Sequence, residues 1–211
     1  MVMVKFILVR HGYSVFNKEK RFTGQIDAPL DERGIEQAKR NAEYVIANYK
    51  IDCIYSSDLI RAYNTVKPVA DVLGLPIIPS KGLRELYIGQ WEGRSIAEVK
   101  QTEPEALAFY RKRIPESCTP GGETRLQLRE RVTRTMAEIA AANDGKTVLI
   151  GSHGGAIRAL CCAWQGYAIE EIDNVPDLRN ASVTVVSYDP QTGRADFELF
   201  NYNEQLGELA T

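Results

Sequence analysis

The sequence predicts an α/β protein, a three-layer sandwich with a mostly parallel central sheet and helices on both faces. Short apolar runs that are typical of buried strands alternate along the chain with longer segments of helical periodicity. Strands that are separated by helices favour a parallel sheet covered on both faces. The stretch from about 94 to 122 interrupts this alternation with three prolines, so we expect a small helical insertion there, over one edge of the sheet.

The individual elements follow from the spacing of apolar residues and from the residues that begin and end helices. The helix after the first strand has apolar residues at helical spacing from Ile35 to Tyr49, with Asp31 as its N-cap. Gly74 and Gly145 are expected to end two later helices. We expect strands at 5–9, 52–55, 77–78 and 147–150, helices at 59–73, 123–142 and 153–164, and a C-terminal hairpin of 182–188 and 195–202.

Length and composition indicate a single globular domain, residues 1–211, that includes the insertion. Hydrophobic residues make up 44% of the chain and charged residues 26%, as in ordinary globular proteins. The net charge of −2 provides no bulk attraction to nucleic acid or to an anionic membrane. No apolar run approaches the length of a membrane span, and the N-terminal run is too short for a signal peptide. We therefore expect no nucleic-acid or membrane partner.

The four cysteines are expected to be reduced. They form no CxxC pair, and two histidines are too few to complete a zinc site. Cys53 falls in a predicted strand, and Cys161 and Cys162 lie on an apolar helix, so we expect core packing for Cys53 and for at least one of the other two. Reduced thiols favour a cytoplasmic protein.

The chain has only two histidines, and each follows a predicted buried strand and precedes a glycine. His11 comes after the apolar run 6–9, and His153 comes after the run 148–150. If both strands belong to one parallel sheet, both imidazoles lie at the carboxyl ends of strands, where such sheets bind ligands. One imidazole can then attack phosphorus while the other holds the phosphoryl oxygens.

Phosphoryl transfer also needs cations for the non-bridging oxygens and an acid for the leaving group. Arg10 adjoins the first histidine, and Arg61 falls in the first turn of a predicted helix near the same edge of the sheet. An arginine can bind two phosphoryl oxygens at once. The backbone amide of Gly154, at the start of a helix, adds a donor. Glu85, just after the third strand, is the candidate acid that protonates an alkoxide leaving group.

Six motifs in this order resemble those of the histidine phosphatase superfamily, the phosphoglycerate mutase-like family. Any one of them is a weak signal, whereas six in sequence are highly specific. Two positions depart from the commonest pattern, since Tyr13 and Phe16 stand where the family often has other residues. The motifs are Arg10-His11-Gly12 with Asn17, Gly24 to Gly34, Ser56 to Thr65, Leu83 to Gly93, Pro120 to Glu123 and Ser152 to Gly155.

The resemblance implies a metal-independent reaction through a phosphohistidine, with the helical insertion over the active site and no cofactor. His11 is the implied nucleophile and Glu85 the implied proton donor. The implied phosphate pocket consists of Arg10, Arg61 and His153. The further residues expected to bind substrate or phosphate are Asn17, Thr23, Gly24, Gln25 and Gly154, although residues 23–25 are also compatible with a plain turn.

A phosphatase and a mutase can start from the same phosphoenzyme. Residues 21–24 resemble phosphoglycerate mutases, which return the phosphoryl group to a bound glycerate and use 2,3-bisphosphoglycerate as cofactor. Residues 86–93 resemble broad-specificity and cobalamin-pathway phosphatases instead, and the chain is shorter than typical mutases. We therefore predict a phosphomonoester hydrolase, an acid-type histidine phosphatase for a small phosphorylated metabolite. A cofactor-dependent phosphoglycerate mutase is the alternative.

Other interpretations are weaker. A non-catalytic module that binds a phosphorylated ligand would keep the arginines but usually lose His11 or Glu85, and both are present. A metal-dependent hydrolase would need an HExxH motif or a carboxylate cluster, and a P-loop enzyme would need GxxxxGK[ST]. Outside their motifs, His11 would be interpreted as a hydrogen-bonded histidine at a strand end, and Arg61 as a solvated helix residue. Outside its motif, Glu85 would be interpreted as a surface carboxylate or as a salt-bridge partner of an arginine such as Arg84.

The expected partner is a small-molecule phosphomonoester. Specificity is expected to depend on the insertion, because loops and lids carry such contacts. Exposed-looking apolar residues between Trp164 and Val175 leave a homodimer open. The candidate specificity residues are Phe109, Tyr110, Arg111 and Arg113.

Overall fold

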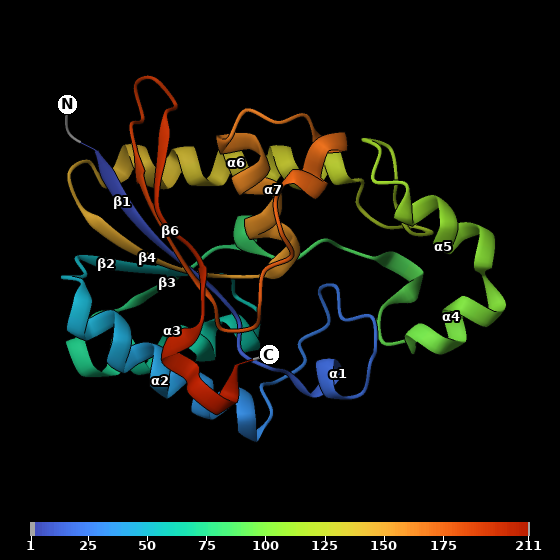
Figure 1. The fold of residues 1–211 in the computed structure, drawn as a ribbon, viewed down its shortest axis with the longest axis horizontal. Helices are drawn as coiled ribbons and strands as arrows, with labels where there is room; N and C mark the ends of the chain where they lie inside the picture. The colour runs from blue at the N-terminus through green and yellow to red at the C-terminus, as the bar shows by residue number, and fades with distance from the viewer. Residues whose placement is uncertain (1–2, 211) are drawn as a thin grey trace.

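The computed structural model describes residues 3–210, which form three layers with a six-stranded sheet in the middle (Figure 1). The order of the strands is β3-β2-β4-β1-β5-β6. The first four in this order run parallel, and the C-terminal hairpin of β5 and β6 adds two antiparallel strands. The predicted α/β fold with a mostly parallel sheet is therefore confirmed. The strands are β1 (Val4–Arg10), β2 (Cys53–Ser56), β3 (Ile77–Pro79), β4 (Thr147–Ser152), β5 (Val183–Tyr188) and β6 (Ala195–Tyr202).

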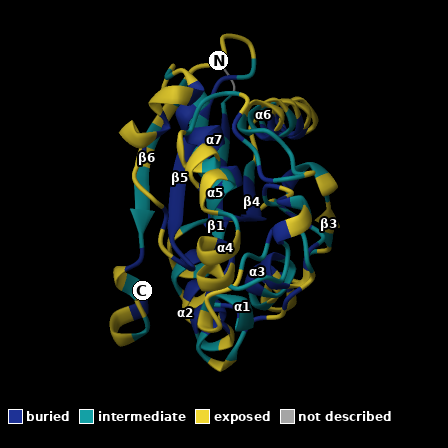
Figure 2. Cartoon of the chain, turned by 90° about the vertical axis from the view of Figure 1, so that its right-hand side faces the viewer, coloured by how far each residue is buried: buried dark blue, intermediate teal, exposed yellow. Residues whose placement is uncertain are grey.

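Two pairs of long helices cover the two faces of the sheet (Figure 1). Successive side chains of a strand point to opposite faces, so β1 is apolar on both. Phe6 and Leu8 pack in the core with α6 (Arg125–Ala142) and α7 (Gly154–Trp164). Ile7 and Val9 pack in the core with α2 (Glu32–Asn48) and α3 (Ile60–Leu73). The continuous apolar run of β1 is the signature of a strand that is buried on both faces, as the dark blue strands of Figure 2 show.

The helix boundaries show which terminal signals were interpreted correctly. The Asp31 side chain accepts a hydrogen bond from the Gly34 amide at 2.8 Å, so it is the N-cap of α2 as predicted. Gly74 ends α3 in the left-handed region, at φ +65°, as predicted. Helix α6 begins two residues later than expected. Thr124 and Gln127 form a capping box there, which satisfies amide donors at the start of the helix.

The register of the parallel strands brings the two histidines together. Arg10 at the end of β1 lies opposite Ser152 at the end of β4, so the residues that follow, His11 and His153, leave the sheet side by side. The amide of His11 donates to the carbonyl of Ser152 at 2.9 Å. Both histidines therefore lie at the carboxyl edge of the sheet, next to the end of β2.

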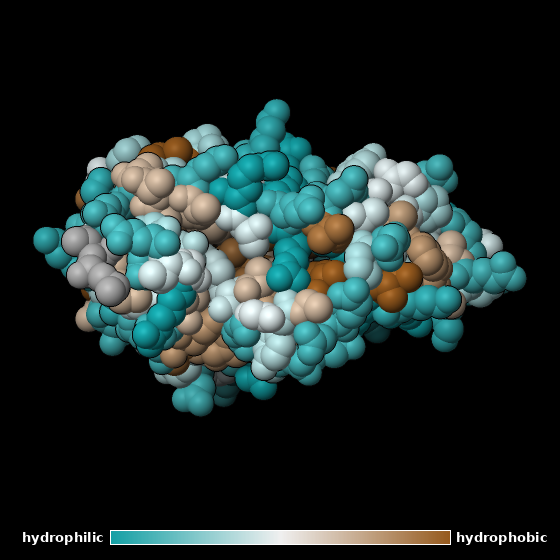
Figure 3. Space-filling model, turned by 90° about the horizontal axis from the view of Figure 1, so that it is seen from above, coloured by the Kyte–Doolittle hydropathy of each residue, from teal (hydrophilic) through white to brown (hydrophobic). Residues whose placement is uncertain are grey.

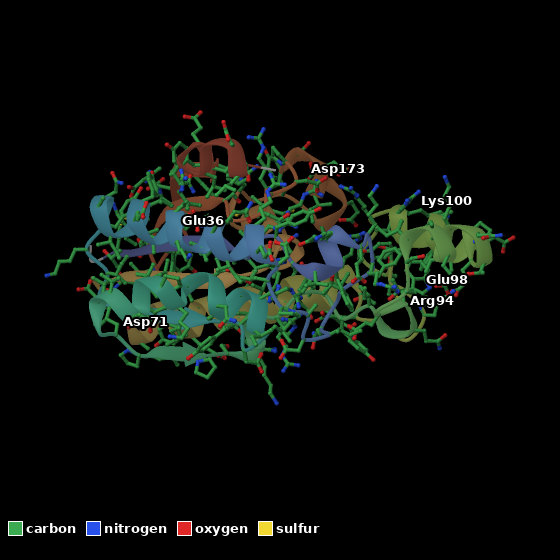
Figure 4. The ribbon with its side chains drawn as sticks, turned by 90° about the horizontal axis from the view of Figure 1, so that it is seen from below. Glu36, Asp71, Arg94, Glu98, Lys100 and Asp173 are labelled. Carbon is green, nitrogen blue, oxygen red and sulfur yellow. The ribbon has the colours of Figure 1, made fainter. Side chains whose placement is uncertain are left out.

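The segment from about 94 to 122 forms a short helical lobe beside the main body, with α4 (Ile96–Thr102) and α5 (Pro104–Arg111) (Figure 1). Its own small core contains the fully buried Trp91, whose indole N–H donates to Glu103 at 2.8 Å. Arg94 pairs with the same glutamate and with Glu98 on α4, next to which it lies in Figure 4. The Trp91 hydrogen bond joins the insertion to the residues before it, and the Arg94 ion pairs join segments within the insertion.

The short helix after α7 differs from one expectation. The apolar residues between Trp164 and Val175 looked exposed in sequence, but Ile169, Ile172 and Val175 are buried in the core of the chain itself. The indole of Trp164 stacks on Phe6. The expected exposure of these apolar residues was therefore wrong, and a homodimer stays an untested prediction. The short elements are α1 (Val15–Lys18), η1 (Lys81–Leu83), η2 (Gly89–Trp91), η3 (Ile169–Asn174) and η4 (Glu204–Leu209).

All four cysteines carry free thiols. Cys161 and Cys162 are buried. Cys53 is half-buried, and its thiol donates a hydrogen bond to Oδ1 of Asn143 at 3.2 Å. This burial agrees with the packing role expected for these cysteines. None of the helices within residues 3–210 is long and apolar enough to cross a bilayer.

Candidate active site

A cavity of about 630 Å³ lies over the carboxyl edge of the sheet. Its inner wall includes Arg10 and His11 from the end of β1, Arg61 from α3 and Glu85 from the loop after β3. Its outer wall includes residues of the insertion, such as Tyr110. Figure 3 shows apolar side chains in the hollow where the lobe of α4 and α5, on the right, meets the main body. The topology thus brings residues that are far apart in sequence to one site.

His11 is held as a neutral imidazole with one free nitrogen. Its Nδ1 lies 2.7 Å from the carbonyl oxygen of Gly12, which can only accept, so the proton is on Nδ1 and Nε2 keeps its lone pair. The ring is 5% exposed. Burial, followed by the charges of Arg61 and Arg10, lowers the pKa of His11 well below its usual range. A neutral imidazole with a free Nε2 is a competent nucleophile.

His153 lies beside His11 with its ring fully buried, and the two ring centroids are 5.3 Å apart. Its Nε2 lies 2.8 Å from the hydroxyl oxygen of Ser57. We infer that the hydroxyl donates to Nε2, which leaves the proton of this ring on Nδ1. Burial is the main cause that lowers the pKa of His153 well below its usual range, and Arg61 and His11 add to it. The neutral ring is therefore a hydrogen-bond donor, not a cation.

Three buried N–H groups of this site have no hydrogen-bond partner within the part of the chain that the structure describes. They are Nδ1 of His153 and the Nε atoms of Arg10 and Arg61. Other atoms of the two guanidinium groups are anchored, because Arg10 donates to the carbonyl of Leu178 and Arg61 to those of Gly24 and Ile26. Burial lowers the pKa of Arg61 to about 10, so it stays charged at neutral pH. Buried polar groups are normally paired, so these donors indicate the position of an anionic ligand.

Glu85 lies against the start of α7. Its Oε2 accepts a hydrogen bond from the Gly155 amide at 3.0 Å, and its Oε1 accepts one from Leu86 at 2.9 Å. Arg10, Arg61 and Glu85 line the same cavity, and the charge of Glu85 raises the pKa of both arginines against the effect of burial. The alternative of an ion pair with Arg84 is wrong, because Arg84 binds both carboxylate oxygens of Asp58, at 2.6 and 2.7 Å.

The paired glycines after His153 allow two functional side chains to approach α7 closely. A Cβ atom at Gly155 would lie 2.4 Å from Oε1 of Glu85. One at Gly154 would lie 3.1 Å from Nε of Arg10. Any side chain at Gly155 would therefore displace the carboxylate, which explains in steric terms why glycine follows glycine in this motif.

Asn17, Thr23 and Gly24 also line the cavity, together with Gly154. The Oδ1 of Asn17 accepts from the amide of Ser14 at 3.1 Å, so the amide group is held in place. Gln25 is different, because it is not part of the cavity wall and its Nε2 donates to the carbonyl oxygen of Glu85 at 3.0 Å. The Gln25 side chain therefore supports the backbone of Glu85, and a role of Gln25 in binding substrate or phosphate stays a prediction.

The insertion contributes three of its four predicted specificity residues to the cavity wall. Tyr110, Arg111 and Arg113 line the cavity, whereas Phe109 does not and is 38% exposed. Arg113 forms an ion pair with Asp173, which Figure 4 labels on η3. The insertion thus contacts the main body across the cavity, and this outer wall is rich in arginine.

Two residues that hold the histidines were not singled out from sequence. Ser57 belongs to a quoted motif, but only the fold brings its hydroxyl to His153. Asn180 donates to the carbonyl oxygen of His11 at 3.2 Å from a loop 169 positions away, and no sequence pattern marks it. Among the residues that the structure describes, no group of three or more His, Cys, Asp or Glu side chains could hold a metal ion.

Comparison with known proteins agrees with this geometry. The chain belongs to the histidine phosphatase superfamily, whose branch 1 family model matches residues 6–201. The six motifs predicted this family correctly.

Its relatives include both phosphatases and mutases. A metal-independent phosphoserine phosphatase of Arabidopsis thaliana is 33% identical over 186 residues, which are 87% of this chain and 76% of that protein. A 2,3-bisphosphoglycerate-dependent phosphoglycerate mutase of Gloeobacter violaceus is 31% identical, over 82% of this chain and 81% of that one. A solved structure of mycobacterial glucosyl-3-phosphoglycerate phosphatase with VO3 has a TM-score of 0.85 at 29% identity, and covers 94% of this chain and 99% of its own.

Proposed function

We propose that the protein is a metal-independent phosphomonoester hydrolase that acts through a phosphohistidine at His11. The observation that carries this proposal is the set of unpaired N–H donors of Arg10, Arg61 and His153 around the free Nε2 of a neutral imidazole. Such a set can bind the three non-bridging oxygens of a phosphoryl group while the imidazole attacks phosphorus. The phosphatases among the relatives support the same reaction class.

In the first step, the Nε2 lone pair of His11 attacks phosphorus and the bond from phosphorus to the ester oxygen breaks. We propose that the negative charge of the bound phosphoryl group next to Glu85 favours the acid form of this carboxyl in the complex. Glu85 then gives its proton to the ester oxygen, so an alcohol leaves rather than an alkoxide. Arg10 and Arg61 neutralise the charge on the non-bridging oxygens, and Nδ1–H of His153 donates to one of them. The products of this step are N-phosphohistidine, the alcohol and an ionised Glu85.

In the second step, water attacks the phosphohistidine. The Glu85 carboxylate accepts the proton of that water, the P–N bond breaks, and its electron pair returns to Nε2 of His11. Inorganic phosphate leaves and the acid form of Glu85 is restored. The reaction needs no cofactor, and the low pKa of His11 keeps the nucleophile neutral at mildly acidic pH, which supports an acid-type phosphatase.

The proposed substrate is a small phosphorylated metabolite whose organic part lies along the outer wall of the cavity. A volume of about 630 Å³ exceeds what a phosphoryl group alone requires. The arginine-rich outer wall favours an organic part that carries negative charge, and the ring of Tyr110, with the Arg125 guanidinium 4.8 Å from its centre, adds an apolar surface. We propose Tyr110, Arg111 and Arg113 as specificity residues and, from the free thiols, a cytoplasmic location.

A cofactor-dependent phosphoglycerate mutase is the second candidate. Residues 21–24, which resemble mutases, contribute to the cavity wall, and a mutase is among the relatives. A mutase must keep water away from the phosphohistidine and return the phosphoryl group to a bound acid. The two functions therefore differ in what attacks the phosphoenzyme, and a single assay separates them.

The test measures release of inorganic phosphate from phosphoserine, glucosyl-3-phosphoglycerate and other phosphomonoesters in the presence of EDTA. Conversion of 3-phosphoglycerate to 2-phosphoglycerate is followed in parallel, with and without 2,3-bisphosphoglycerate. Phosphate release without isomerisation is the expected result. Isomerisation that depends on bisphosphoglycerate and is faster than release would establish the mutase instead.

The role of Glu85 has its own test. Glu85→Gln is expected to lower kcat/KM for an alkyl phosphate by about 10²–10⁴-fold, the range of general acid catalysis. The loss with 4-nitrophenyl phosphate is expected to be much smaller, because nitrophenolate leaves without a proton. We compare kcat/KM because it does not include the second step, in which Glu85 serves both substrates alike. Equal losses would show that Glu85 is not the proton donor.

A further inference from the structure

We propose that Arg131, on α6, is a positioning residue that holds the backbone of the proton donor Glu85 in place for the reaction. This inference rests on the proposed function, in which Glu85 must deliver a proton to the ester oxygen. Arg131 does not line the cavity, and no sequence motif singled it out. It acts through the loop that carries Glu85.

The guanidinium of Arg131 uses all of its five N–H donors on this loop and on one carboxylate. Its Nη1 donates to the carbonyl oxygens of Gly82 and Arg84, both at 3.0 Å. Its Nη2 donates to the carbonyl oxygen of Glu85 at 3.2 Å. The remaining donors bind Glu123 in a bidentate pair, with Nε to Oε1 at 2.8 Å and Nη2 to Oε2 at 2.7 Å. A guanidinium has five N–H donors in a planar fork, so this arrangement saturates it.

We call these hydrogen bonds of Arg131 the clamp, and Glu123 extends the clamp to the other side of Glu85. Its backbone amide donates to the carbonyl oxygen of Tyr87 at 2.8 Å, and its carboxylate accepts from the Tyr87 amide at 3.3 Å. Arg131 and Glu123 together therefore bind the chain at positions 82, 84, 85 and 87. Their side chains are only 19% and 14% exposed, so solvent screens the pair weakly.

The clamp constrains the position of the Glu85 carboxylate. The carbonyl of Glu85 is held by Arg131 and by Gln25, and its Oε2 is held by the Gly155 amide at the start of α7. The carboxyl group is thus fixed between its own backbone and α7. A proton donor must lie within hydrogen-bond reach of the ester oxygen, and a displacement of about 1 Å can cost about 10²-fold in rate.

Lysine cannot replace Arg131. Its ammonium group has three donors on a flexible stem and lacks the planar fork, so it cannot bind three carbonyl oxygens and both oxygens of a carboxylate. Arg131→Lys keeps the charge and most of the volume, and it removes the geometry. This substitution therefore separates positioning from charge.

The experiment compares kcat/KM of wild type and Arg131→Lys for an alkyl phosphate and for 4-nitrophenyl phosphate. We expect a loss of about 10–100-fold with the alkyl phosphate and of less than about threefold with the nitrophenyl ester. In a Glu85→Gln background, Arg131→Lys is expected to cause no further loss with the alkyl phosphate, because the group that it positions is gone. Arg134→Lys, on the exposed side of the same helix, is the matched control and should behave as wild type.

The following results would contradict the positioning role of Arg131. Equal losses with both substrates, or a full additional loss in the Glu85→Gln background, would show that Arg131 is only structural. If Arg131→Lys does not fold by far-UV circular dichroism, Glu123→Gln replaces it, because it removes the bidentate pair and keeps the arginine. The same substrate split is expected there in weaker form, and its absence would overturn the proposal. A wild-type protein that hydrolyses neither ester would refute the proposed function itself, which distinguishes the two failures.

Discussion

Acidification from pH 7.0 to 5.5 is expected to destabilise the protein through its two histidines. Both rings are neutral in the folded protein, because burial and the charge of Arg61 lower the pKa of His11 and of His153 well below the usual range. In the unfolded chain both rings titrate near the ordinary value of 6.5. Unfolding at acidic pH therefore takes up two protons that the native state does not bind.

The sign and the size of the effect follow from proton linkage. The free energy of unfolding rises with pH wherever the unfolded state binds more protons than the native state. The contribution of the two histidines is therefore fully present above pH 6.5, and it decreases as the pH falls toward their lowered native pKa values. Integration from pH 7.0 to 5.5 gives a loss of about 1.2 kcal/mol for each histidine and about 2.5 kcal/mol for the pair. That is a large fraction of the stability of an ordinary domain, about 5–15 kcal/mol.

The assay is urea unfolding followed by far-UV circular dichroism at pH 7.0 and pH 5.5 in phosphate-free buffers. Because the chain has no other histidine, His11→Gln is a direct control, and its loss over the same interval is expected to fall to about 1.2 kcal/mol. Most carboxylates titrate below this interval. A wild-type stability that is constant or increases on acidification would show that the native pKa values of the two imidazoles are not lowered, and it would refute a nucleophile that stays neutral at acidic pH.

Three further outcomes test the chemistry of the site. His11→Gln is expected to abolish phosphate release with an unchanged circular dichroism spectrum, and turnover near wild type would exclude His11 as nucleophile. Arg61→Lys is expected to lower kcat by about 10²-fold, because the anchored guanidinium loses its fork, and full activity would reduce Arg61 to a point charge. Ser57→Ala removes the hydrogen bond that orients the ring of His153, so kcat is expected to fall roughly tenfold, as a bond of about 1.5 kcal/mol implies; an unchanged kcat would show that this bond does not hold the ring.

Most of the fold could be predicted from the sequence because its signals are local. The apolar run of β1, the N-cap Asp31 and the C-terminal Gly74 each identify an element from neighbouring residues alone. The later start of α6 shows the limit of this approach, because a capping box decided the boundary. Apolar residues of η3 were assigned to the surface because burial depends on which distant segment covers them, and a sequence does not show that.

The candidate site was predictable to the extent that its residues belong to motifs. Arg10, His11, Arg61, Glu85 and His153 were all chosen from sequence, and the structure brings them together at one edge of the sheet. Gln25 was assigned to substrate or phosphate from the resemblance of its motif, and the backbone of Glu85, to which its side chain donates, is 60 positions away. Contacts between residues so far apart in sequence depend on the topology of the fold, which local sequence patterns do not show.

The sequence by itself determined the family, and it predicted the reaction class and the candidate residues, because each motif combines a reactive side chain with the glycine or strand end that it needs. Only the tertiary structure decided how those side chains are set. The lowered pKa of His11 depends on burial and on the charge of Arg61, the tautomer of His153 on Ser57, and the position of Glu85 on Arg131. The physical reason is that burial and hydrogen-bond partners, which set protonation and orientation, come from segments that only folding brings together.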